Sequence, residues 1–328
     1  MLRRHHIRKI WYATLCAAAF GGGAYSGASA QNYPDRLVRV VSTTPSGGAG
    51  DVVMRLVAER VSRRLKQAVV IEAQPAAAGQ VATQAVVRAE PDGYSLLWGN
   101  SNLVNTQVVR KNLPFDVLRD LTPISLAVEL PFLLFVNSSL PFNTLEEFVR
   151  YARARPGELA YGSVGVGSGI HLAGESLGRS LRAPMTHIPY ASTGVGTLIA
   201  DLSENRIQVL FSSMSTMQSV LDSGKVKVLA VSSKDRYALY PQAQPIAEVL
   251  PDFIEVPVWF GMLGPARTPK AIIDLWSSEI RMVLHEPEVK LRLDGLGLVG
   301  VASNPEQMGQ AMQAGITDIS ALVKDLKL

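Results

Sequence analysis

The sequence predicts an α/β protein with two lobes and a ligand-binding cleft between them. The 328-residue chain alternates short apolar runs with amphipathic segments, which is typical of sheets covered by helices. Two apolar runs end in uncharged turns rich in Gly, Ser and Thr, at residues 42–51 and 162–171, and we expect a helix after each. A helix start without bulky side chains presents free N–H groups to an anion. Two such turns on separate segments favour a ligand held between two lobes.

The expected elements follow one another regularly along the chain. In the first half we expect strands at 37–41, 69–72, 95–99 and 133–136, and helices at 51–66, 81–89 and 144–154. In the second half we expect strands at 159–161, 186–190, 207–211 and 226–231, and helices at 170–181, 195–202, 217–221, 269–284, after Pro287, and at 305–326. Thr144 and Glu147 have the spacing of a capping box. The alternation of strands and helices predicts mostly parallel sheets.

The net charge of +4 comes from the N-terminal segment. Four of the 32 Lys and Arg residues lie within residues 1–30, which contain no acid, so the rest carries 28 bases against 28 acids. A neutral chain argues against nucleic acid or an anionic membrane surface as the main partner.

Residues 1–30 have the pattern of a cleaved secretory signal peptide. Basic residues precede an apolar stretch at 10–20, and Ala28-Ser29-Ala30 precedes the expected cleavage site. The alternative is a membrane anchor, but the stretch is shorter than the roughly 20 residues of a spanning helix. The single cysteine, Cys16, lies inside this segment, so the mature chain has no thiol chemistry. We therefore expect an exported periplasmic protein.

No linker composition marks a domain boundary, so we infer it from the order of the elements. We predict a first lobe formed by residues 31–128 and 252–328, and a second lobe inserted at 129–251. The chain then crosses between the lobes twice, and the two crossings form a hinge.

The candidate pocket turns carry no Lys or Arg. They are residues 42–51, 100–102, 162–171, 192–196 and 212–215. An anion bound there would be held by amide and hydroxyl donors. Asp51 is interpreted first as an acid that caps its own helix, and second as a residue that orients the turn or meets a ligand amine.

Enzyme and metal signatures are weak. His171 and Glu175 share a helix face, but the mature chain has only three scattered histidines, so a structural role is favoured over a metal site. Ser163 and Ser168 lie near glycines without forming Gly-x-Ser-x-Gly, and no nucleotide-binding loop occurs, so we expect no cofactor. Trp259 and Phe260 are interpreted as cleft wall or plain core.

Together, these segments resemble the extracytoplasmic substrate-binding receptors of tripartite tricarboxylate transporters, the Bug receptors. The resemblance runs in order over the mature chain. Its markers are Gly47-Gly48 with Asp51, Pro91-Asp92-Gly93-Tyr94, Tyr161-Gly162-Ser163, Gly167-Ser168, His171 to Glu175, His187-Ile188-Pro189-Tyr190, Val228 to Val231, and Leu263-Gly264-Pro265-Ala266 with Thr268-Pro269.

The resemblance implies a periplasmic-binding-protein-like fold (type II), in which two α/β lobes close on a small carboxylate-bearing ligand without catalysis. It further implies a monomer that delivers its ligand to the membrane permease subunits of such a transporter. The candidate ligand-binding residues are Thr44, Ser46, Gly47, Gly48, Ala49, Gly50, Asp51, Asn100, Ser163, Gly165, Gly167, Ser168, His171, Tyr190, Ser192, Thr193 and Ser213. The chain departs from the family pattern at Thr44, Gly50, Gln74, residues 76–78 and Ala191, which predicts a pocket of different shape.

Two other functions are weighed against the transport receptor. One is an exported hydrolase that uses Ser163 or Ser168 as its nucleophile. The other is the same ligand-binding fold presenting its ligand to a sensor protein.

Overall fold

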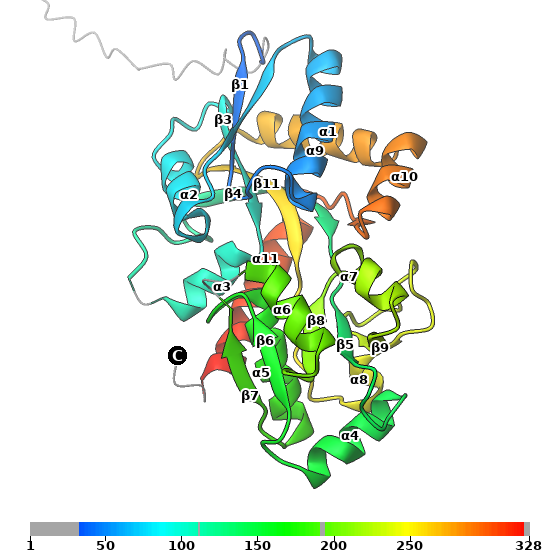
Figure 1. The fold of residues 1–328 in the computed structure, drawn as a ribbon. Coiled ribbons are helices and arrows are strands. Elements are labelled where there is room, and N and C mark those ends of the chain that lie inside the picture. Colours follow the sequence, from blue (N-terminus) through cyan, green and yellow to red (C-terminus); the bar gives the residue numbers. More distant parts are fainter. Residues whose placement is uncertain (1–32, 111, 191–193, 325–328) are drawn as a thin grey trace, which may run out of the picture.

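The protein contains two mixed six-stranded sheets, one in each lobe (Figure 1). A computed structural model describes residues 33–110, 112–190 and 194–324. The first sheet has the order β12-β4-β11-β3-β1-β2 and the second the order β10-β9-β5-β8-β6-β7.

The strands are β1 Val38–Ser42, β2 Val69–Ala73, β3 Ser95–Asn100, β4 Leu121–Glu129, β5 Leu133–Asn137, β6 Ala160–Ser163, β7 Thr186–Pro189, β8 Val209–Ser212, β9 Val226–Val231, β10 Gln244–Pro245, β11 Trp259–Pro265 and β12 Val299–Gly300. The helices are α1 Ala49–Leu65, α2 Gln80–Val87, α3 Asn102–Val109, α4 Leu145–Ala154, α5 Gly169–Leu181, α6 Gly194–Ser203, α7 Met214–Asp222, α8 Ile246–Val249, α9 Lys270–Leu284, α10 Pro287–Gly295 and α11 Pro305–Val323. A 3₁₀ turn, η1 Ala76–Gly79, precedes α2.

Each sheet is buried on both faces, which explains why its strands are continuous apolar runs. In β5, Leu133 and Phe135 pack with α6 and α7, whereas Leu134 and Val136 pack with α4 and α5. In the first lobe, α1 and α9 cover one face of the sheet, and α2, α3 and α11 cover the other.

The expectation of mostly parallel sheets is wrong at the strands next to the crossings between the lobes. The chain leaves the first sheet at the end of β4 and enters the second at β5, which pairs antiparallel with both β8 and β9. It returns through β11, which pairs antiparallel with β3 and β4. Strands joined by a local strand–helix–strand connection are parallel, and a strand that enters from the other lobe runs in the opposite direction to them.

Several elements were not expected from the sequence, namely α3, β4, β10, α8, β11 and β12. The capping box of α4 is confirmed, because the Thr144 side chain accepts the Glu147 N–H and the Glu147 side chain accepts the Thr144 N–H. The predicted signal segment lies outside the described residues. The predicted lobe boundaries stay a prediction.

Candidate functional site

The first candidate turn leads from β1 into α1, and the carboxylate of Asp51 forms a hydrogen bond across it. Asp51 Oδ2 accepts the Gly47 N–H at 2.9 Å and an N–H of Arg55, also at 2.9 Å. Burial alone would raise the pKa of Asp51, but the hydrogen bonds from Arg55 and Gly47 hold it below its usual range. Its other oxygen, Oδ1, is buried and has no hydrogen-bond partner among the described residues. This geometry supports the capping interpretation of Asp51.

The hydroxyl groups at the beginning of this turn form hydrogen bonds with each other. Ser42 Oγ lies 2.8 Å from Thr44 Oγ1, and both side chains are buried. Ser46 is exposed. At the helix start, Gly48 is the N-cap residue, and a β-carbon added to Gly50 would overlap the ring of Phe260. The Gly50 backbone therefore lies against that ring.

The second candidate turn leads from β6 into α5. Ser168 is the N-cap, with its Oγ accepting the His171 N–H at 3.3 Å and donating to the Gly165 carbonyl at 2.7 Å. Gly165 and Gly167 have φ values of 131° and 81°, a region that favours glycine. No described residue accepts the backbone N–H groups of Gly169 and Ile170. The turn thus presents two free amide donors at the positive end of a helix.

A buried cluster of rings lies beneath this turn. His171 Nδ1 accepts the Gly167 N–H at 3.2 Å, and the His171 and His187 ring centroids are 4.3 Å apart. Burial followed by repulsion from His187 lowers the pKa of His171 to about 4. The hydroxyl of Tyr161 lies 2.5 Å from Glu175 Oε1. His171 is therefore a neutral structural group that fixes the turn.

Ser163 lies 2.7 Å from His187 Nε2, which is the distance of a nucleophile–base pair. However, the Ser163 residue is fully buried, and its Oγ also accepts the Gly165 N–H at 3.0 Å. A substrate carbonyl has no access to this oxygen. The pair holds the turn in shape and does not present a nucleophile.

A cavity of about 200 Å³ lies between the two candidate regions of the lobes. It is lined by Asn100, Ser101 and Asn102 of the first lobe, Val164, Ser168, Gly169 and Ile170 of the second, and Phe132, Val258 and Phe260 near the crossings. Among the described residues, no Lys, Arg, Asp or Glu lines it. The structure thus brings Asn100 and Ser168, two of the candidate residues, together in one cavity wall, and places Gly50 of the first turn behind the Phe260 ring.

Other predicted residues lie elsewhere. The Tyr190 hydroxyl is 2.6 Å from Asp201 Oδ2, and Ser213 caps α7 by accepting the Thr216 N–H. Ser192 and Thr193 lie outside the described residues. The predicted roles of all these residues in ligand binding stay predictions.

The sequence analysis missed the lining side chains Phe132 and Val258 and, next to the site, Asn105. Asn105 in α3 is 1% exposed, and its Nδ2 has no hydrogen-bond partner among the described residues. This atom lies 3.9 Å from the position that a β-carbon on Gly169 would occupy, so it faces the start of α5. In the sequence, Asn105 could have been noticed as an amide that directly follows the apolar residues Leu103 and Val104 and lies one helical turn after Ser101.

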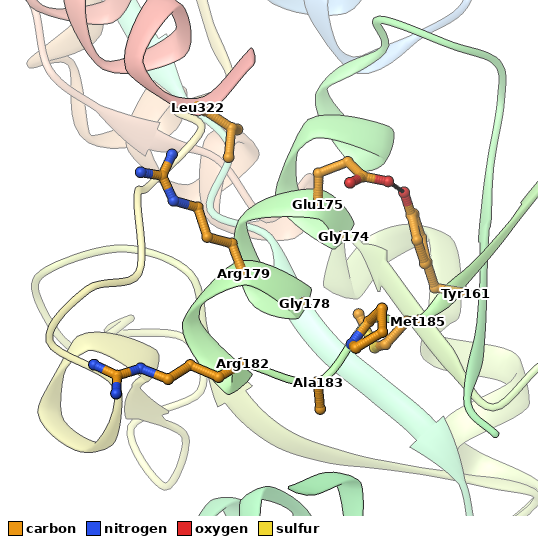
Figure 2. A pocket seen from close by; sticks show the side chains of 10 residues that line it. Tyr161, Gly174, Glu175, Gly178, Arg179, Arg182, Ala183, Met185 and Leu322 are labelled. Atoms are coloured by element: carbon orange, nitrogen blue, oxygen red, sulfur yellow. Dashed lines mark hydrogen bonds between the residues drawn. The ribbon is translucent and has the colours of Figure 1, made fainter. Parts of the chain in front are cut away.

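A second cavity, of about 330 Å³, lies on the outer side of α5 in the second lobe (Figure 2). Its wall includes Tyr161, Glu175 and Met185, and Leu322 of α11 closes one side. Arg179 extends along α11 and donates to the Ala321 carbonyl at 2.8 Å. This cavity shares with the ring cluster only the Tyr161–Glu175 pair.

Among residues 33–324, leaving aside the undescribed positions, no three His, Cys, Asp or Glu side chains are grouped to hold a metal ion. Within the same part of the chain, every helix is too short or too polar to cross a membrane.

Comparisons with known proteins agree with this geometry. The family model described as "Tripartite tricarboxylate transporter family receptor" matches residues 53–328. The chain is 30% identical to Protein BugT of Bordetella pertussis over 282 residues, covering 85% of this chain and 86% of BugT.

Two solved structures share the fold at similar identity. R. palustris Rpa4515 with adipate is 28% identical, with a TM-score of 0.75, covering 89% of this chain and 97% of that one. MatC from Rhodopseudomonas palustris with bound malate is also 28% identical, with a TM-score of 0.70 and coverage of 89% and 100%. The predicted periplasmic-binding-protein fold with two α/β lobes is confirmed. The chain belongs to the tripartite tricarboxylate transporter receptor family.

Proposed function

We propose that this protein is a periplasmic receptor that captures a small carboxylate between its lobes and delivers it to the membrane permease subunits of a tripartite tricarboxylate transporter. The observation that carries the proposal is the 200 Å³ cavity, to which both lobes contribute uncharged polar groups. Its volume is below the roughly 300–1,000 Å³ of pockets for drug-sized ligands, so the ligand is small.

Relatives support the carboxylate class. The adipate and malate complexes named above are structures of similar proteins, and the match to this chain spans at least 97% of each of them. In this chain the carboxylate would meet free helix amides and hydroxyls without a cationic side chain. Residues 1–30 would be removed on export, and the mature receptor would act as a monomer without catalysis.

Binding is tested with the mature protein, residues 31–328, by thermal shift against a panel of mono- and dicarboxylates. A ligand at about one hundred times its Kd should stabilise the folded state by roughly 2.7 kcal/mol. Calorimetry at low and high salt should show similar affinities. Salt screens the attraction between two exposed charges, whereas hydrogen bonds from uncharged amide donors depend much less on salt. Absence of a shift with every member of the panel would contradict the proposal.

Two variants locate the ligand. Gly169→Val adds bulk at the cavity wall, where a β-carbon would stand 3.6 Å from Phe132 Cε2, and should reduce binding. Gly178→Val in the same helix is the matched control, because the atoms nearest to a β-carbon at Gly178 would be 3.8 Å away. Equal loss in both variants would place the ligand outside this cavity.

Delivery to a permease is tested separately. Uptake of the bound carboxylate should be lost in a strain that lacks the receptor and restored by the full-length chain. Intact uptake with a lost transcriptional response would favour the sensor function instead.

A further inference from the structure

The two segments that cross between the lobes run side by side as one antiparallel ribbon. Glu129 and Trp259 are partners in the β4–β11 register, and the Leu130 N–H donates to the Val258 carbonyl at 2.8 Å. Successive side chains of an extended ribbon point to opposite faces, so the ribbon separates two cavities. One face contributes Phe132, Val258 and Phe260 to the cavity of about 200 Å³, and the other contributes Glu129, Pro131, Pro257 and Trp259 to a cavity of about 660 Å³, which we call the rear cavity.

Both lobes line the rear cavity. Ala314 and Asp318 of α11, which packs on the first sheet, form one side of it. The loop at 233–238, which follows β9 of the second sheet, forms another side. The cavity of about 200 Å³ on the opposite face of the ribbon is also lined by both lobes. A rotation of the lobes about the ribbon that widens one cavity therefore narrows the other.

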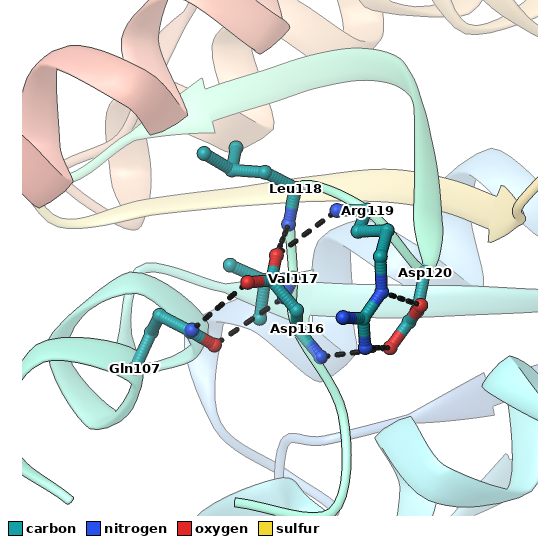
Figure 3. A network of polar contacts seen from close by, with 6 residues as sticks. All are labelled: Gln107, Asp116, Val117, Leu118, Arg119 and Asp120. Atoms are coloured by element: carbon teal, nitrogen blue, oxygen red, sulfur yellow. Dashed lines mark hydrogen bonds and ion pairs between the residues drawn. The ribbon is translucent and has the colours of Figure 1, made fainter. Parts of the chain in front are cut away.

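The other end of the ribbon is fixed to the first lobe. Figure 3 shows the turn at 116–120, directly before β4, joined to Gln107 of α3. The Asp120 carboxylate accepts the Asp116 N–H at 2.8 Å. The Asp120 carbonyl accepts the N–H of Ala266, the residue after β11, at 2.9 Å. Because this end is held by hydrogen bonds, a rotation of the lobes is taken up at the crossings, beside the rear cavity.

Three carboxylates from three segments line the rear cavity. Glu129 ends β4, Glu255 lies in the second crossing, and Asp235 lies in the loop of the second lobe. Glu129 and Glu255 are half-buried. Glu255 accepts the backbone N–H of Lys234 at 3.3 Å, and within the described part of the chain no cation forms an ion pair with any of the three carboxylates. Their mutual repulsion is therefore not cancelled by a salt bridge.

The other titratable groups on this wall leave an excess of negative charge. They are Lys234, Arg236, Tyr237 and Asp318. Arg236 is paired with Glu248 at 3.2 Å, and the exposed Lys234 offsets only part of the repulsion. Burial, and then repulsion from Asp235, raises the pKa of Glu129, and burial followed by repulsion from Glu129 raises the pKa of Glu255 to about 7. The charge in the rear cavity thus changes near neutral pH.

We propose that Glu129, Glu255 and Asp235 form a pH-sensitive hinge between the lobes. When the three carboxylates are ionised, their repulsion widens the rear cavity and thereby narrows the cavity on the other face of the ribbon. When Glu129 and Glu255 take up protons, the rear cavity narrows and the lobes open on the ligand side. This inference goes beyond the proposed function and rests on it only where ligand affinity is concerned.

The first test needs no ligand. Residues 31–328 contain no cysteine, so nitroxide labels can be attached through Ala238→Cys and Ala314→Cys, at two exposed positions on the rim of the rear cavity, one from each lobe. The distance between the labels, measured by double electron–electron resonance, should be longer at pH 8.5 than at pH 5.5. With Glu129→Gln and Glu255→Gln introduced together, the distance should be the same at both pH values. A distance that is unchanged or shorter at pH 8.5 in the protein with both glutamates would overturn the proposal.

The second test measures binding of adipate by calorimetry. The state with the narrowed ligand cavity holds fewer protons, so adipate affinity should be at least about threefold higher at pH 8.5 than at pH 6.5, with protons released on binding. Glu255→Gln should remove most of this dependence, and Glu158→Gln, at an exposed site, should keep it. Adipate affinity that is independent of pH in the wild type would overturn the hinge and leave the proposed function intact. If no carboxylate of the panel binds, the proposed function is rejected and the label distances decide the hinge.

Discussion

The imidazole of His171 accepts the backbone N–H of Gly167 at Nδ1 over 3.2 Å, which ties the first turn of α5 to the glycine-rich turn before it. The same ring lies 4.3 Å from the ring of His187, and its Nε2 is 3.8 Å from Glu175 Oε1. Protonation at Nδ1 would remove the acceptor. The shape of the turn therefore depends on a neutral histidine.

We expect His171 to make the stability depend on pH below neutrality. Burial and then repulsion from His187 lower its pKa to about 4 from 6.5, so the unfolded chain binds the extra proton between these values. Stability should fall by roughly 2–3 kcal/mol between pH 7 and pH 4.5. His171→Asn, which keeps an acceptor oxygen, should lose less over this range in denaturant unfolding. The exposed-residue variant His285→Asn should behave like the wild type, and equal pH profiles for all three proteins would refute the assignment.

Glu255 should produce a pH dependence of the opposite sign. Burial, and then repulsion from Glu129, raises the pKa of Glu255 to about 7. The folded state then binds the extra proton, so stability falls as the pH rises from about 4.5 through 7. Glu255→Gln should be more stable than the wild type by about 1–3 kcal/mol at pH 8, and this gain should vanish at pH 4.5. Glu158→Gln, at an exposed site, is the control; a gain independent of pH would contradict the prediction.

Two glycines of α5 should respond to alanine in opposite directions. A β-carbon at Gly174 would overlap the buried ring of Tyr161, whereas at Gly178 the nearest atoms are 3.8 Å away. Gly174→Ala should lower the free energy of unfolding by about 1–3 kcal/mol through overpacking. Gly178→Ala should raise it by up to about 1 kcal/mol through helix propensity. Similar values for both in urea unfolding would show that the Tyr161 ring yields without cost.

The contact between Gly50 and Phe260 should couple the first turn to the cavity. Because a β-carbon at Gly50 would overlap the ring of Phe260, Gly50→Ala should push this ring and reduce carboxylate affinity at least about fivefold. Phe260→Leu in the same molecule should restore part of the affinity. Gly309→Ala, where a β-carbon would stand 3.7 Å from Pro123, is the control. Additive effects of the two changes in calorimetry would argue against the coupling.

Much of the fold follows from local patterns in the sequence. Residues Thr144 and Glu147 mark the start of α4, and Ser168 marks the start of α5, because a helix cap needs only neighbours three residues away. The apolar run at Leu133 to Val136 predicts a strand, and the structure shows that this strand is buried on both faces. These features depend on residues close in the chain.

The sequence did not predict α3, β4 or β11. The segment from Asn102 to Val109 contains β-branched valines and has no side-chain cap, and β4 is interrupted by Pro123 and Ser125. Such segments take their structure from packing, since α3 packs against η1 and α11, and β11 pairs with strands on both sides. Tertiary contacts override weak local preference there.

The chain by itself determined two α/β lobes and turns at helix starts that contain no Lys or Arg. Only the tertiary structure decided that Asp51 and His171 serve their own turns, and that Asn105 faces Gly169 from the other lobe. The physical reason is separation along the sequence. Turn and cap hydrogen bonds join near neighbours, whereas the approach of Asn105 to Gly169 exists only when both lobes have folded.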